Sequence, residues 1–322
     1  MGASHARVMS ALPGASLVAV CDADGARAKE VASKYSTEAV SDYRALDGRV
    51  DAVSVAVPTI AHAEVAGFFL ERGVSVLVEK PMARNSAEAR RLVDEAAKSG
   101  ATLMVGHIER FNPAFMAIDD LAVRPLFIEC DRISPFRFRS ADIGVVFDLM
   151  IHDIDIILRL ARSKPARIDA VGVAVIGANE DICNARIEFE NGVVANVTAS
   201  RVATKSLRKI RLFSRESYIT IDYAARQVFI YKKSGKLQFD VATAMKSGAT
   251  SLADFAGLSF PDLLDIKELK LDDHEPLHKE LEAFVNSVET KTRPPVTGTD
   301  GLEAIEIAEA VVRSVKGHEW KV

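Results

Sequence analysis

The chain has 322 residues, of which 48% are hydrophobic and 27% charged, and its net charge is −4. This composition is typical of a globular protein with room for two domains, and the charge gives no indication of a nucleic-acid or membrane partner. No apolar run approaches the roughly 20 residues that span a bilayer. The three cysteines (Cys21, Cys130 and Cys183) are far apart, which argues against a disulfide framework or a zinc site and leads us to expect a cytoplasmic protein.

The first part of the chain alternates apolar strands with helices. Val74–Glu79 is a continuous apolar run that ends before Pro81, as is typical of a strand buried on both faces of a parallel sheet. The alternation predicts an α/β domain over residues 1–107 with a Rossmann-like, doubly wound parallel sheet. The other expected strands are Leu17–Cys21, Val50–Val57 and Thr102–Val105, and the expected helices are Ser4–Leu12, Gly25–Lys34, Ala61–Arg72 and one from Asn85 or Ser86 to Ser99.

The pattern changes after Gly106. A strand at Leu126–Arg132 and helices near Pro113–Leu121 and Val145–Arg162 precede six segments in which polar and apolar residues alternate. Residues 108–322 are therefore expected to form an α+β domain with a large, mainly antiparallel sheet that serves substrate binding and oligomerisation. A late helix, near 275–290 or 302–315, is a candidate for packing back on the first domain. The six segments are Ile168–Ile176, Asp181–Phe189, Val193–Ser200, Lys209–Ser214, Tyr218–Tyr223 and Gln227–Lys232.

The N-terminus departs from the dinucleotide-binding pattern of a strand, Gly-x-Gly-x-x-Gly and a helix. Gly2 opens the first helix, and Asp22 follows roughly 20 residues later at a strand end, so Gly2 is similar to the third glycine. The central strand of the sheet is then missing, and the strands beside it would lack their shared partner. We expect the natural start to lie some 10–20 residues upstream, from the length of a strand and a glycine loop. A degenerate first motif is the alternative.

Candidate cofactor contacts lie at the carboxyl ends of the strands, where open α/β sheets bind ligands. Asp22 is placed to accept hydrogen bonds from a ribose and to repel a 2′-phosphate, which favours NAD over NADP; a helix cap is the alternative role. The Pro58-Thr59 turn and His62 are expected near the nicotinamide, although an ordinary turn has the same pattern.

Glu79-Lys80-Pro81 places a lysine at the same edge. Lys80 could hydrogen-bond or polarise a substrate hydroxyl, and a surface salt bridge with Glu79 is the alternative. His107 and Arg110, which follow the last parallel strand, are expected to line the same crevice for substrate binding.

Asp148, His152 and Asp155 are spaced i, i+4 and i+7, so a helix would carry them on one face. Histidine trades protons near neutral pH, and Asp148 could orient its ring or bind a substrate hydroxyl. We predict no metal, because no further neutral nitrogen or thiolate is evident; a solvated helix face is the alternative.

Arg137 and Arg139 alternate on an extended segment, and two guanidinium groups on one side suit a phosphate or carboxylate. They could equally pair with acids or line a subunit interface. The basic run from Arg201 to Arg211 is interpreted as a solvated face.

Together, Glu79-Lys80-Pro81, Asp148-x-x-x-His152, the order of the two domains and the late Glu275-Pro276-Leu277 resemble the Gfo/Idh/MocA oxidoreductases, the family of glucose–fructose oxidoreductase and inositol dehydrogenases. The resemblance implies that Lys80 and His152 flank a sugar or polyol hydroxyl, assisted by Asp148, while NAD accepts hydride. It also implies homodimers or homotetramers built through the open face of the second sheet.

The stretches Gly106–Phe115 and Phe136–Asp155 are most similar to the UDP-N-acetylglucosamine 3-dehydrogenases of this family. We therefore expect NAD-dependent oxidation of a secondary sugar hydroxyl, with Arg137 and Arg139 at a diphosphate. An inositol or polyol dehydrogenase, an NAD-using glycoside hydrolase and a non-catalytic cofactor-binding regulator are the alternatives. The expected cofactor-binding residues are Gly2, Asp22, Pro58, Thr59, His62, Glu79, Lys80 and Pro81, and the expected substrate-binding residues are His107, Arg110, Arg137, Arg139 and Asp155.

Overall fold

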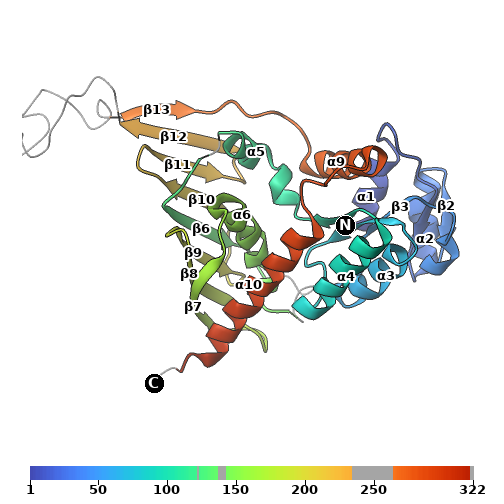
Figure 1. The fold of residues 1–322 in the computed structure, drawn as a ribbon, viewed down its shortest axis with the longest axis horizontal. Helices are drawn as coiled ribbons and strands as arrows, with labels where there is room; N and C mark the ends of the chain where they lie inside the picture. Colours follow the sequence, from blue (N-terminus) through green and yellow to red (C-terminus); the bar gives the residue numbers. More distant parts are fainter. Residues whose placement is uncertain (122, 137–142, 234–263, 320–322) are drawn as a thin grey trace, which may run out of the picture.

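The computed structural model describes residues 1–121, 123–136, 143–233 and 264–319. It has two halves (Figure 1): a first half of parallel strands and helices, and a second half in which helices lie against a large sheet. In the described residues, no helix combines the length and apolar character needed to cross a membrane.

The parallel strands of the first half form two sheets, β1-β2 and β3-β4-β5. β4 is buried along its whole length, as its apolar run predicts, and it ends at Glu79 before Pro81. β1 and β3 do not pair with each other. β2 was not predicted, because three residues are too few to show a period. The strands are β1 (Ala19–Cys21), β2 (Glu38–Val40), β3 (Ala52–Val55), β4 (Ser75–Glu79) and β5 (Leu103–Gly106).

Two helices of the first half begin at side-chain caps, whereas α1 and α3 each begin two residues earlier than expected. The side chain of Asn85 accepts a hydrogen bond from the backbone of Glu88 and caps α4, which ends where Gly100 adopts a left-handed conformation at φ 75°. Asp24 caps α2 in the same way. The helical elements are α1 (Gly2–Met9), α2 (Gly25–Lys34), the 3₁₀ turn η1 (Tyr43–Leu46), α3 (Thr59–Leu70) and α4 (Ser86–Ser99).

The second half is built on an eight-stranded sheet in the order β13-β12-β11-β10-β6-β9-β8-β7. Every neighbouring pair is antiparallel except β6 and β9, which run parallel. In β8, Cys183, Ala185 and Ile187 are buried and alternate with more exposed residues, so one face of the sheet carries the core. The strands are β6 (Phe127–Ile133), β7 (Pro165–Val173), β8 (Ile182–Phe189), β9 (Val194–Ser200), β10 (Leu207–Phe213), β11 (Ser217–Asp222), β12 (Gln227–Lys233) and β13 (Leu264–Glu268).

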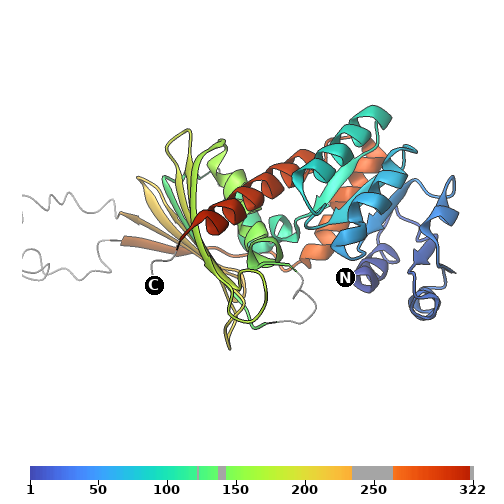
Figure 2. The ribbon, with the colours of Figure 1, turned by 90° about the horizontal axis from the view of Figure 1, so that it is seen from below.

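Two C-terminal helices contact both halves. α9 packs against α1, and α10 packs against α4 in the first half and against α6 and β7 in the second. Figure 2 shows α10 lying along the inner side of the large sheet and reaching toward the parallel strands. The remaining helical elements are η2 (Ile108–Phe111), α5 (Pro113–Asp119), the π-helical turn η4 (Val146–Met150), α6 (Ile151–Ala161), α9 (Pro276–Thr290) and α10 (Gly298–Gly317).

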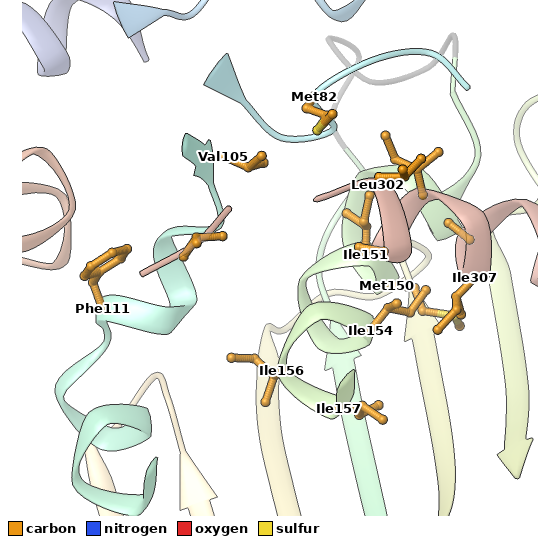
Figure 3. Packing of buried hydrophobic residues seen from close by; sticks show 14 of the residues in the cluster. Met82, Val105, Phe111, Met150, Ile151, Ile154, Ile156, Ile157, Leu302 and Ile307 are labelled. Atoms are coloured by element: carbon orange, nitrogen blue, oxygen red, sulfur yellow. The ribbon is translucent and has the colours of Figure 1, made fainter. Parts of the chain in front are cut away.

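The hydrophobic core runs without a break between the halves (Figure 3), where Met82 and Val105 face α10 above Ile151. Gly301 permits this approach, because a Cβ atom there would lie 2.7 Å from both Met82 Sδ and Val105 Cγ2. The packing therefore fixes the carboxyl ends of β4 and β5 relative to α6.

Candidate active site

The ends of β4 and β5 approach each other closely. A Cβ atom on Gly106 would lie 3.2 Å from the Cα atom of Glu79, so this position requires a residue without a side chain. Lys80 and Pro81 follow Glu79, joined by a cis peptide bond, and His107 follows Gly106. The side chains after these two strands therefore share one edge of the sheet, as predicted.

Lys80 joins this edge to the second half of the chain. Its Nζ atom donates a hydrogen bond of 2.7 Å to the backbone oxygen of Asp148 in η4. The side chain is partly buried, so the alternative of a surface salt bridge with Glu79 does not describe it. Two of the sequence motifs, 68 residues apart, meet in this contact.

His152 begins the first regular turn of α6 beside this contact. Part of its surface stays accessible, yet the surrounding protein and the charges of Lys80 and Arg132 hold its pKa well below the usual value. Burial, only partly opposed by Asp155, also lowers the pKa of His107. Within the described residues, the Nδ1 atoms of both rings are buried without a hydrogen-bond partner. Both imidazoles are therefore neutral near pH 7, and His152 has the acid–base chemistry of a proton acceptor.

Glu79 turns away from this edge into the protein. Its Oε1 atom lies 3.0 Å from His5 Nε2, and His5 Nδ1 lies 2.6 Å from Ser54 Oγ. Burial alone would raise the pKa of Glu79, but His5 and Lys80 bring it below its usual value. Glu79 thus ties α1 to β4, and the structure gives it a supporting position in place of the cofactor contact expected. His5 was missed; its place three residues after Gly2 was the available signal.

His62 also differs from the expectation of a cofactor contact. Its Nδ1 atom lies 2.8 Å from the Pro81 oxygen, and its Nε2 atom lies 2.8 Å from the Val57 oxygen. Burial lowers its pKa, and a neutral ring donates from one nitrogen only, so one of the two carbonyl groups at a time accepts a hydrogen bond from it. His62 holds the turn after β3 against the turn after β4, and it acts on the crevice through the backbone.

Arg110 and Asp155, both expected at the substrate, are instead paired inside the protein. Arg110 Nε and Nη2 donate hydrogen bonds of 2.8 and 2.7 Å to the two carboxylate oxygens of Asp155. The side chains are 7% and 1% exposed. Asp155 therefore does not share an open face with His152, and a buried guanidinium requires such a partner. The π-helical turn η4 precedes both His152 and Asp155, so it changes their position relative to Asp148 and not relative to each other.

A second buried network lies next to it. Arg132 donates two hydrogen bonds to Asp153, at 2.8 and 2.9 Å, and a third of 2.9 Å to Glu109. All three side chains are at most 8% exposed. None of them was assigned a role from the sequence, because each partner lies far along the chain.

The residues at the amino-terminal side fit a dinucleotide. No side chain caps α1, which begins at Gly2, or α3, which begins at Thr59 after Pro58. Uncapped N–H groups are free to face an anion such as a pyrophosphate. The Asp22 carboxylate follows β1 and is 30% exposed, with Arg27 at 3.4 Å, so it remains accessible to a ribose. The roles of these residues stay predictions.

The remaining sequence predictions concern two arginines and a metal site. Arg137 and Arg139 lie outside the described residues. Across the ranges that the structure covers, no group of three or more His, Cys, Asp or Glu side chains is arranged to hold a metal ion.

Comparisons with known proteins cover both halves. The model of an oxidoreductase family with an NAD-binding Rossmann fold, GFO_IDH_MocA, matches residues 1–107, and the model of the GFO/IDH/MocA C-terminal domain matches residues 127–220. The chain is 36% identical over 234 residues to a UDP-N-acetylglucosamine 3-dehydrogenase of Acidithiobacillus ferrooxidans, which covers 72% of this chain and 74% of the relative. It is 27% identical to an inositol 2-dehydrogenase of Rhizobium meliloti, over 98% of this chain and 94% of that one.

Solved structures agree with this. A structure of the Acidithiobacillus ferrooxidans enzyme superposes with a TM-score of 0.86 at 30% identity, covering 98% of this chain and 94% of the other. A levoglucosan dehydrogenase in complex with NADH and L-sorbose superposes with a TM-score of 0.82, with the same shares covered. At 20% identity the latter shows a shared fold.

Proposed function

The chain belongs to the Gfo/Idh/MocA family of NAD-binding oxidoreductases, and from this premise we propose that it oxidises a secondary hydroxyl of a nucleotide sugar, with C3 of UDP-N-acetylglucosamine as the leading candidate. The observation that carries the proposal is the contact of Lys80 with the backbone of Asp148, which brings the lysine to the helix that bears His152. The similarity to a UDP-N-acetylglucosamine 3-dehydrogenase over 72% of the chain supports the choice of substrate.

The side chains have complementary roles in such an oxidation. Lys80 hydrogen-bonds the hydroxyl oxygen and stabilises the negative charge that develops on it. Neutral His152 accepts the hydroxyl proton, and its low pKa keeps the ring able to do so near pH 7. Asp148 orients the sugar through a neighbouring hydroxyl. When bound, NAD supplies the hydride acceptor.

The cofactor is expected at the amino-terminal side of the crevice. The N–H groups at the start of α1 would face its pyrophosphate, Asp22 its adenosine ribose, and the Pro58-Thr59 turn its nicotinamide half. The accessible Asp22 carboxylate favours NAD over NADP, because it would repel a 2′-phosphate.

An inositol or polyol dehydrogenase is the second candidate. The inositol 2-dehydrogenase of Rhizobium meliloti matches nearly the full chain, and the same Lys80 and His152 chemistry suits any secondary alcohol. The two candidates differ in whether the substrate carries a nucleotide.

The test is turnover of the purified protein with NAD and a panel of UDP-N-acetylglucosamine, UDP-glucose, free N-acetylglucosamine and myo-inositol, followed by NADH absorbance. We expect NADH formation with UDP-N-acetylglucosamine. Turnover of myo-inositol without turnover of either UDP-sugar would overturn the nucleotide-sugar assignment. Release of a free sugar from a glycoside without net NADH formation would indicate the glycoside hydrolase instead.

We also propose that the protein forms a homodimer or homotetramer through the second sheet. Phe127, Phe213, Tyr218 and Tyr231 form a row across β6, β10, β11 and β12, with ring centroids 4.8 to 5.5 Å apart. They alternate with the buried residues of these strands, so they lie on the face opposite α6 and α10. Light scattering checks the proposal, and a monomer at micromolar concentration would refute it.

A further inference from the structure

Arg208 lies on the face of the large sheet that is directed toward α6 and η2. It is paired with Arg132 in the antiparallel register of β10 and β6. Residues directly opposite each other in such a pair have their side chains on the same face. The Arg132 side chain contacts Asp153 on α6 and Glu109 in η2, so Arg208 also faces these elements.

The two arginines differ in how their guanidinium groups are satisfied. Arg132 is 4% exposed and donates three hydrogen bonds to carboxylates. Arg208 is 47% exposed, and its distance of 3.9 Å to Glu109 Oε1 is too long for a hydrogen bond. That oxygen already accepts a hydrogen bond from Arg132. Arg208 therefore presents donors to solvent beside a carboxylate that is engaged elsewhere.

Arg208 also lies close enough to the catalytic helix to act on it. Burial and Lys80 are the main causes that lower the pKa of His152, and the positive charge of Arg208 is a further cause. Glu109 follows the end of β5, at the edge of the sheet that carries Lys80. Arg208 is thus near enough to Lys80 and His152 to contact other groups of a substrate whose reacting hydroxyl lies between those two side chains.

We propose that Arg208 binds the diphosphate of a nucleotide-sugar substrate whose sugar ring lies between Lys80 and His152; this rests on the proposed function. A guanidinium group donates in a planar fork that matches phosphate oxygens and keeps its charge at any working pH. An exposed fork suits an anion attached to a sugar that is bound beside Lys80 and His152, whereas Arg110 and Arg132 are buried and already paired with carboxylates.

Lys209 provides a matched control. It is the next residue on β10, its side chain lies on the opposite face, and it forms an ion pair of 3.3 Å with Asp222. Arg208→Gln and Lys209→Gln each remove one positive charge from the same strand. Only Arg208→Gln removes the charge from the face of the sheet that is directed toward α6 and η2.

The experiment measures UDP binding by calorimetry in the presence of saturating NADH, which occupies the cofactor site, together with steady-state kinetics on UDP-N-acetylglucosamine. Arg208→Gln is expected to weaken UDP binding and raise KM by about 10- to 100-fold, the range for a lost hydrogen bond to a charged group. Its kcat should stay within about twofold, as should all parameters of Lys209→Gln. Uridine, which lacks the phosphates, should bind the wild type and Arg208→Gln alike.

The outcomes separate this proposal from the proposed function. If the wild type does not oxidise UDP-N-acetylglucosamine, the proposed function fails. If it does, but Arg208→Gln binds UDP normally or Lys209→Gln loses as much affinity, the role of Arg208 is refuted. Failure of UDP to bind the wild type would refute it as well. Thermal unfolding checks folding, and Arg208→Lys, which keeps the charge without the fork, should give intermediate UDP affinity.

Discussion

Two groups of polar side chains lie around α6 and differ in their partners. Arg110 with Asp155, and Arg132 with Asp153, form buried ion pairs in which the carboxylate oxygens accept short hydrogen bonds. The second group is Lys80 and His152: Lys80 donates a hydrogen bond to a backbone oxygen, and His152 has a buried nitrogen without a hydrogen-bond partner in the described part of the chain.

The difference separates residues that stabilise the fold from residues that are expected to act in the reaction. A buried polar atom without a partner costs about 1–3 kcal/mol, so a fold retains one where a ligand or a reaction uses it. The ion pairs, in turn, fix η2 and α6 to β6 and so hold the helix that bears His152. We therefore expect the first group to control stability and the second to control turnover.

Substitution at the second group should have the largest effect. Lys80→Ala and His152→Ala are each expected to lower kcat by about 10²- to 10⁴-fold, the usual contribution of a positioned acid–base group. NADH affinity and the unfolding midpoint should stay close to those of the wild type, because the ion pairs are untouched. Lys279→Ala, which removes an exposed lysine on α9, is the control for loss of charge. Near-wild-type kcat in both variants would remove the catalytic assignment.

Breaking a buried ion pair should instead lower the stability of the folded protein. Arg132→Met leaves Asp153 and Glu109 buried without their cation, and the free energy of unfolding should fall by about 3–5 kcal/mol. Arg211→Met is the control, since Arg211 pairs with Asp131 and Glu129 on the other face of the same sheet at 40% exposure. There the expected loss is at most about 1 kcal/mol. Urea unfolding of the two variants measures both losses. An equal fall in the free energy of unfolding would show that burial of the ion pair does not cause the difference.

The proposed catalytic group is easier to recognise in the sequence than the paired group, for a physical reason. Lys80 is recognisable because a buried strand and a proline precede and follow it locally, and His152 because a helical period relates it to Asp148. The partner of Arg110, in contrast, lies 45 residues away. No local pattern specifies such a pair, so Arg110 and Asp155 were both assigned to the substrate.

Arg208 illustrates the same limit. Its basic neighbours suggested a solvated face, and the side of the sheet that it occupies depends on the register between β10 and β6. The π-helical turn of η4 likewise has no periodic signature in the sequence. Local pattern thus predicted most of the strands and helices, whereas the tertiary pairing of charges required the structure; the catalytic roles of Lys80 and His152 stay predictions.

The comparison between buried polar groups with and without a partner also applies to the carboxylate of Glu280 on α9. It is fully buried, and within the described residues neither of its oxygens has a hydrogen-bond partner. Burial, reinforced by Glu79, raises its pKa well above the usual 4.5. A carboxyl group with a raised pKa in the folded state contributes stability below the unfolded pKa and loses it as pH rises toward the folded one.

Glu280→Gln should therefore change the pH dependence of stability. Between pH 5 and 8 the wild type should lose stability relative to the variant, by up to about 1.4 kcal/mol per pH unit. Unfolding midpoints of the two proteins across this range provide the measurement. Parallel pH profiles would show that Glu280 is ionised in the folded protein, and hence that it has a partner.

The smallest expected effect tests whether the charge of Arg208 acts on His152. His152 must be neutral to accept a proton, so kcat/KM should decline only on the acidic side, below the usual histidine pKa of about 6.5, because burial and nearby cations lower the pKa of His152. Arg208 is one of these cations, and removing its charge makes protonation of His152 easier. In Arg208→Gln the acidic limb should therefore move to higher pH, while in Lys209→Gln, on the far face, it should stay in place. A shift to lower pH, or equal shifts in both variants, would show that the field at His152 does not come from Arg208.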